Sequence, residues 1–136
     1  METEFLKWSD DYSIGLQEID NQHKKLLDII NKLYTAFINR DEDMVMEDIL
    51  VQMTDYTKYH FGTEEKYFKQ FGYKNTSDHL EQHKIYIAKL SAFQNDFKNN
   101  QKITYSVMNF LRNWLVNHIQ GIDRNYVALF KENGVK

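Results

Sequence analysis

The chain contains no cysteine, no proline and only 5 glycines among its 136 residues. Without cysteine, disulfides, iron–sulfur clusters and thiol-based catalysis are excluded. Proline breaks helices, so its absence allows long uninterrupted helices. The scarcity of glycine leaves few of the turns that an all-β protein needs. The composition, 42% hydrophobic and 15% aromatic, is that of a globular protein and not of a disordered one. These features favour a mainly helical globular protein.

Neither sign of charge is in large excess, and the apolar runs are short. The 17 basic and 20 acidic residues give a formal net charge of −3, and no basic block marks a nucleic-acid-binding surface. The amino terminus lacks the positive start and apolar run of a signal peptide, and no stretch approaches the roughly 18 apolar residues of a membrane span. We therefore expect a cytoplasmic protein that binds neither nucleic acid nor membrane. We also expect a monomer with a single domain over residues 1–136.

Four stretches of the sequence show the period of an amphipathic helix, with short polar breaks between them. They cover about residues 20–39, 42–71, 78–98 and 104–132. Asp20 is a candidate N-cap for the first stretch, and Gly72 is placed to end the second. Because the breaks are short, neighbouring helices should run antiparallel. The sequence thus predicts an all-α, up-down-up-down four-helix bundle over residues 20–132, with residues 1–19 as an N-terminal arm packed on it.

All five histidines of the chain fall in these helices, each in phase with the apolar residues of its helix: His23, His60, His79, His83 and His118. One histidine on an apolar stripe is usually a hydrogen-bonded core residue. Five buried imidazoles, however, need donors and acceptors that an apolar core cannot supply. A bound metal satisfies them together, so the pattern predicts a metal site inside the bundle.

One carboxylate shares a helix face with a histidine in an obvious way. Glu64 lies four residues after His60, so both side chains project from the same side of a helix. Glu65 is off this face and is interpreted as a solvated charge. Gly62, between the two candidate ligands, is costly in a helix interior and suggests that another helix approaches closely there.

A second carboxylate, Asp123, lies five residues after His118, which is about 140° out of phase in a regular helix. Two interpretations are open. Asp123 is either a boundary residue paired with Arg124 or Lys131, or a metal ligand brought round by a π-helical distortion near Gly121.

The donor set argues for a pair of redox-active metals. Seven ligands exceed the four or so of a lone zinc site, and calcium or magnesium prefers oxygen. The Glu-x-x-His motif of carboxylate-rich di-iron bundles does not occur in the sequence. Five imidazoles and two carboxylates suit two iron ions best. Two octahedral ions offer about twelve positions, of which imidazoles, bridging carboxylates and a bridging oxygen fill about eleven, so that one stays open for a small ligand.

The motifs His60-x-x-x-Glu64, His79-x-x-x-His83 and His118-x-x-x-x-Asp123, preceded by Ile19-Asp-Asn-Gln-His23, resemble those of the hemerythrins, in particular the single-domain bacteriohemerythrins. The resemblance extends from Trp8 to about Phe130. It implies a four-helix bundle that holds a non-haem di-iron centre and binds O₂ reversibly as a hydroperoxide. It also implies the ligand assignment: His79, His83 and His118 on one iron, His23 and His60 on the other, and Glu64 and Asp123 bridging both.

The same resemblance gives the open position to the iron with two histidines, and it places Trp114, Leu115 and Ile119 in the apolar lining beside it. Ordinary core packing explains these three residues equally well, and both roles exclude water from the site. No further acid–base residue is evident near the ligands, so we expect an oxygen carrier or store and not an enzyme. The alternatives are an oxygen or redox sensor, or a scavenger of peroxide or nitric oxide that uses the same centre.

Overall fold

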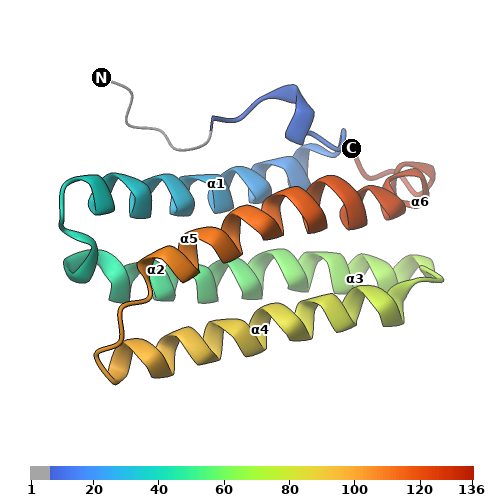
Figure 1. Cartoon of the computed structure of the whole chain (residues 1–136). Helices are drawn as coiled ribbons and strands as arrows, with labels where there is room; N and C mark the ends of the chain where they lie inside the picture. The colour runs from blue at the N-terminus through green and yellow to red at the C-terminus, as the bar shows by residue number, and fades with distance from the viewer. Residues whose placement is uncertain (1–6) are drawn as a thin grey trace.

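The computed structural model describes residues 7–136, except for the side chains of residues 119, 120 and 122. Helices are the only regular secondary structure in this part of the chain. The α-helices are α1 (Gln17–Ile38), α2 (Glu42–Tyr56), α3 (Gly62–Phe71), α4 (Thr76–Lys98), α5 (Thr104–Asn113) and α6 (Val127–Glu132). Figure 1 shows them as four rods lying side by side, each antiparallel to the next along the chain. The predicted all-α, up-down-up-down four-helix bundle is confirmed.

Two of the four rods are composite. α2 continues through a π-helical segment, η2 (Thr57–Phe61), into α3. α5 continues through a longer π-helical segment, η3 (Trp114–Ile122), and a 3-10 turn, η4 (Asp123–Tyr126), into α6. The second and fourth rods therefore cover the predicted ranges, and Gly72 ends the second rod in the left-handed conformation, with φ 66°.

The first rod begins earlier than the sequence suggested. α1 starts at Gln17, so residues 17–19 belong to the bundle and not to the arm, and Asp20 is not the N-cap. The Asp20 carboxylate instead accepts hydrogen bonds from the Ser13 hydroxyl (2.5 Å) and the Ile14 N–H (2.9 Å), which tie the arm to the first turn of α1. The described part of the arm is thus residues 7–16, and residues 1–6 of the predicted arm lie outside the described part of the chain.

Two apolar clusters fill the interior at different heights of the bundle. The larger includes Leu26 and Leu111, and the smaller, toward the chain termini, includes Ile19 and Phe130. In three of the rods the histidines stand between residues of the two clusters, and in α4 they lie between Tyr73, in the loop before the helix, and Tyr86. The bundle therefore encloses a polar layer between two apolar ones, which shields that layer from bulk water.

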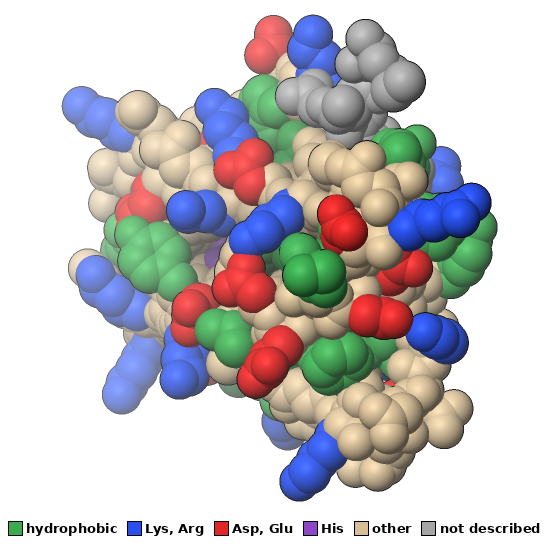
Figure 2. All heavy atoms as spheres, turned by 90° about the vertical axis from the view of Figure 1, so that its left-hand side faces the viewer, with side chains coloured by type: hydrophobic (Ala, Val, Ile, Leu, Met, Phe, Trp, Pro, Cys, Tyr) green, Lys and Arg blue, Asp and Glu red, His purple; other side chains and the backbone are tan. Residues whose placement is uncertain are grey.

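The surface at the end of the bundle that holds the α1–α2 and α4–α5 loops is shown in Figure 2. Its basic and acidic side chains are interspersed, and neither sign dominates that face. Within residues 7–136, no helix is both long and apolar enough to span a bilayer.

Gly62 does not mark a close approach of helices, so that prediction is wrong. Its backbone is helical (φ −60°), it is exposed, and a Cβ placed there would meet no atom within 4 Å. We therefore expect Gly62→Ala to raise the free energy of unfolding by about 1 kcal/mol, because glycine loses more backbone freedom than alanine on helix formation. Urea denaturation of the metal-free variant beside wild type measures the change. A loss of stability would show that a contact at this position matters.

Candidate metal centre

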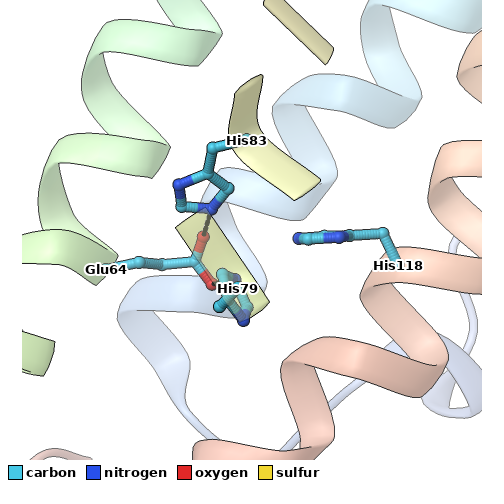
Figure 3. A group of neighbouring side chains, drawn as sticks. All are labelled: Glu64, His79, His83 and His118. Atoms are coloured by element: carbon cyan, nitrogen blue, oxygen red, sulfur yellow. Dashed lines mark hydrogen bonds and ion pairs between the residues drawn. The ribbon is translucent and has the colours of Figure 1, made fainter. Parts of the chain in front are cut away.

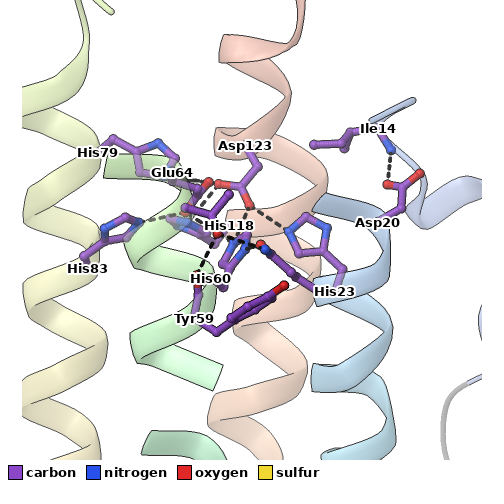
Figure 4. A network of polar contacts seen from close by, with 12 residues as sticks. Ile14, Asp20, His23, Tyr59, His60, Glu64, His79, His83, His118 and Asp123 are labelled. Atoms are coloured by element: carbon purple, nitrogen blue, oxygen red, sulfur yellow. Dashed lines mark hydrogen bonds and ion pairs between the residues drawn. The ribbon is translucent and has the colours of Figure 1, made fainter. Parts of the chain in front are cut away.

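Seven buried side chains from all four rods meet in the polar layer. The five histidines and two carboxylates are each at most 2% exposed. They come from α1 (His23), the second rod (His60, Glu64), α4 (His79, His83) and the fourth rod (His118, Asp123). Figures 3 and 4 show these side chains converging from separate rods on one region. The structure thus brings together every residue that the sequence suggested as a metal ligand.

The potential ligand atoms form two groups, in each of which the atoms lie within 4.8 Å of one another. One group contains Glu64, His79, His83 and His118, and the other contains His23, His60 and Asp123. The first group is drawn in Figure 3, where the three imidazoles surround the Glu64 carboxylate. Three histidines in one group and two in the other is the division that the resemblance implied.

Both carboxylates reach across the two groups. Asp123 places Oδ1 3.0 Å from His118 Nε2 in one group and Oδ2 3.0 Å from His23 Nε2 in the other. Glu64 places Oε1 3.2 Å from His60 Nε2 of the other group and 3.0 Å from His83 Nε2 of its own, with Oε2 3.3 Å from His79 Nε2. Each carboxylate can therefore provide one oxygen to each of two neighbouring metal ions.

Most of these close atoms are not paired by hydrogen bonds. Five of the buried ligand atoms have no hydrogen-bond partner among the described residues: Nε2 of His60, His79 and His118, Glu64 Oε2 and Asp123 Oδ1. Their mutual contacts are 3.0–3.3 Å long. Neighbouring ligand atoms on an octahedron with bonds of about 2.1 Å lie ~3.0 Å apart. The donor set therefore fits metal ions better than an internal hydrogen-bond network.

The π-helical segment η3 explains how Asp123 reaches the same region as His118. In a π-helix each N–H bonds five residues back, so the turn is wider and residues five apart come into phase. The segment ends directly before Asp123, as the distortion predicted near Gly121 requires. The alternative, a boundary Asp123 paired with a basic neighbour, is wrong. Asp123 is fully buried, and the Arg124 guanidinium donates instead to backbone carbonyls of the arm.

The second π-helical segment, η2, holds His60 and was not expected. The spacing of four residues between His60 and Glu64 suits a regular helix, so the sequence gives no sign of a widened turn there. Each composite rod thus carries one π-helical segment, and each segment supplies one histidine of the centre. Such local widenings are found most often at functional sites.

Gln22 holds the His60 imidazole from behind. Its Oε1 lies 2.6 Å from His60 Nδ1, and its Nε2 donates to the Thr63 hydroxyl at 3.0 Å. Since the amide oxygen can only accept, His60 must carry its proton on Nδ1 and turn the Nε2 lone pair toward the centre. Gln22 was not among the predicted site residues, although it directly precedes His23 in the Ile19-Asp-Asn-Gln-His23 motif.

Glu65 is a partner of His83 and not merely a solvated charge, which corrects the interpretation from the sequence. Its Oε2 lies 3.1 Å from His83 Nδ1, although the side chain is 49% exposed. The carboxylate therefore orients the imidazole from the surface, as outer partners of metal ligands commonly do. Its position off the Glu64 face gave no signal, because the contact is made with another rod.

Aromatic and aliphatic side chains close one side of the centre. Trp114 stacks on His118 with ring centroids 3.9 Å apart, and Phe61 stacks on His83 at 3.8 Å. Leu115 is fully buried in the same cluster. The side chain of Ile119, the third predicted lining residue, lies outside the described part of the structure.

Electrostatic attraction competes with burial at Glu64, His79 and His23. Burial and the Asp123 charge raise the pKa of Glu64, but the surrounding histidines outweigh them and lower it to about 2. Burial lowers the pKa of His79, but Asp123 and Glu64 together raise it to about 9. At His23 burial dominates and the pKa is lowered. In the metal-free protein at neutral pH, Glu64 is therefore ionised, and His79 is protonated on both ring nitrogens and positively charged.

We expect the stability of the metal-free protein to fall as the pH rises from 6.5 to about 9.5. The folded-state pKa of His79, about 9, lies above the value of about 6.5 in an unfolded chain, so its contribution is complete below 6.5 and disappears as the pH passes through 9. Urea denaturation should show a loss of roughly 1–3 kcal/mol. The metal-loaded protein should show the opposite trend, because protons compete with the metal for imidazole. A metal-free protein that gains stability over this range would contradict the electrostatic assignment.

Comparison with known proteins identifies relatives across most of the chain. The family model of the hemerythrin HHE cation binding domain matches residues 14–130. Bacteriohemerythrin from Pseudomonas aeruginosa is 33% identical over 122 residues, which cover 90% of this chain and 79% of that protein. Bacteriohemerythrin from Clostridium acetobutylicum is 32% identical over 126 residues, which cover 88% of this chain and 97% of that protein.

A more distant relative and a solved structure agree with this. The hemerythrin-like protein of Naegleria gruberi is 29% identical over 119 residues, covering 88% of each chain. The crystal structure of a hemerythrin mutant aligns with a TM-score of 0.75 at 24% identity, covering 93% of this chain and 97% of that one, which shows that the fold is the same. The chain therefore belongs to the hemerythrin HHE cation-binding domain family, whose members bind non-haem iron through histidine and carboxylate ligands.

Proposed function

We propose that the chain is an oxygen carrier or store that binds O₂ reversibly at a centre of two iron ions. The observation that carries this proposal is the pair of ligand groups with unequal numbers of histidines, joined by two carboxylates. With the carboxylates shared, each group can hold one octahedral ion, and the group with fewer imidazoles leaves a position for a small ligand. Proteins of this family are generally O₂-binding proteins and not enzymes.

In this proposal His79, His83 and His118 hold one iron, His23 and His60 hold the other, and Glu64 and Asp123 bridge them. Two ferrous ions supply, when bound, the two electrons that reversible O₂ binding requires. The chain's own part is to fix the ligands and to exclude water. Gln22 and Glu65 keep two of the imidazoles oriented.

The wall beside the open position is the second part of the proposal. Trp114 and Leu115, with Ile119 as predicted from the resemblance, limit the entry of water and protons. A dry site slows the side reactions by which bound O₂ is lost in reduced form. Cytoplasmic location and a monomeric state remain predictions, which fractionation of the source cells and sedimentation of the native protein would test.

Metal analysis tests the di-iron centre directly. After anaerobic reconstitution with a ferrous salt and removal of unbound metal, the protein should hold about two irons per chain, as the seven ligands require. One tightly bound zinc per chain, with no uptake of iron after it is stripped, would contradict the proposal.

A further inference from the structure

Tyr56 lies against the centre although it has no place in the ligand set. Its ring stacks on the His60 imidazole, one turn along the second rod, with centroids 5.2 Å apart and ring planes 19° apart. The residue is 5% exposed, and its hydroxyl oxygen is closed off from solvent. The rings of Phe61 and Tyr86 pack against it at centroid distances of 6.1 and 6.0 Å. The phenol is therefore held in place beside a member of the two-histidine group.

The Tyr56 hydroxyl has no hydrogen-bond acceptor among the described residues. The buried indole N–H of Trp114 is directed at this phenol as a hydrogen-bond donor. An indole nitrogen only donates, so it cannot accept the phenol proton. Native proteins rarely bury a donor without a partner, and such a group calls for an explanation. An acceptor that comes from outside the chain provides one.

A surface groove leads toward the same residue. It lies between α1 and the second rod, has a volume of about 870 Å³, and is lined in part by Gln22, Tyr56 and Tyr59. The Gln22 amide oxygen accepts a hydrogen bond from the His60 imidazole, and the Tyr56 ring stacks on the same imidazole. The inner wall of the groove is thus one side chain away from a proposed metal ligand, and Tyr56 forms part of that wall.

We propose that the Tyr56 hydroxyl donates a hydrogen bond to the small ligand that binds at the open position beside His60. The inference rests on the proposed function, because it needs that open position. The ligand is a compact molecule with an accepting lone pair, namely O₂ or a small anion such as azide. Phe61 and Leu115 contribute no polar side-chain atom to the wall, and the Trp114 N–H is directed at the phenol oxygen, so the Tyr56 hydroxyl is the donor left for the ligand. A fixed donor in a dry site stabilises negative charge on such a ligand strongly.

The test is the Tyr56→Phe variant, which removes the hydroxyl and keeps the ring. Azide binding to the diferric protein, followed by optical titration, should weaken about tenfold or more, the effect of losing a hydrogen bond to a charged group. Tyr86→Phe is the matched control. Its phenol is also buried, beside the Thr57 hydroxyl, and its ring contacts within the described residues include no histidine. Its azide affinity should stay within about twofold of wild type.

Two further readouts separate the possible outcomes. Metal-free Tyr56→Phe should be at least as stable as wild type, since it loses a donor without an acceptor, and the reconstituted variant should keep its iron. Unchanged azide affinity with full iron content would overturn the role of Tyr56 and leave the proposed function standing. Loss of iron from Tyr56→Phe would also overturn it, because the hydroxyl would then support the centre itself. A wild-type protein that holds iron but binds neither azide nor O₂ would instead overturn the proposed function.

Discussion

Replacing Glu64 with alanine should reduce the iron content of the reconstituted protein from about two ions per chain to fewer than one. The residue is fully buried, and its oxygens lie beside imidazoles of both ligand groups, so in the proposed centre its loss removes a ligand from each ion. It also leaves the histidines around it without the charge that holds them. Metal analysis of the purified variant, beside wild type prepared in the same way, measures the effect.

Glu65→Ala is the matched control, because it removes a carboxylate from the adjacent residue. Glu65 contacts the outer nitrogen of His83 and is half exposed. This variant should therefore load with iron but hold it about tenfold more weakly, as is typical when an outer partner of a ligand is lost. If both variants retained iron equally, Glu64 would not be a bridging ligand.

Leu115→Ala should make the O₂ complex decay at least about tenfold faster while leaving the iron content unchanged. Leu115 is fully buried in the apolar wall and stands one turn before His118. Its truncation leaves a cavity through which water and protons reach the open position, and loss of bound O₂ as peroxide requires both. The cavity should also lower the free energy of unfolding by roughly 2–5 kcal/mol. The decay of the oxygenated optical spectrum gives the rate.

Leu111→Ala separates the wall from general loosening of the core. Leu111 is as fully buried as Leu115 and lies one turn further from His118 in the same rod. Leu111→Ala should lower the free energy of unfolding by a similar amount without accelerating the decay of the O₂ complex. Equal acceleration in both variants would mean that overall stability, and not the wall beside the centre, governs the lifetime of the complex.

Local signals were sufficient to predict the four rods and six of the seven candidate ligands, the five histidines and Glu64. The helical period of the apolar residues and the lack of proline predicted the extent of the second rod. Gly72 predicted its end, and it has the left-handed backbone conformation of a helix end. The histidines could be recognised because all five were in phase with their helices. The limit at the start of α1 was less well predicted, because Asp20, a good capping residue by type, serves the arm and not the helix end.

The residues that the sequence did not reveal act across rods. Gln22 and Glu65 reach their histidines from other helices, and no local period reports such a contact. Spacing in a regular helix placed Asp123 out of phase and left two interpretations, of which the resemblance favoured the ligand. The widened turn of η3 explains how its side chain reaches the site. The unpaired Tyr56 hydroxyl is likewise a property of packing and not of sequence, because the residue itself looks like an ordinary member of an apolar stripe.

The optical spectrum of one reconstituted sample, recorded without oxygen, after aeration and after oxygen is removed again, tests the central claim most directly. A di-iron oxygen carrier should gain new visible absorption on aeration, with about one O₂ taken up for two irons, and should return to the first spectrum when oxygen is removed. Several cycles should leave most of the signal intact. A protein that holds two irons but never accumulates an oxygenated spectrum, while it consumes peroxide or nitric oxide rapidly, would contradict the carrier function.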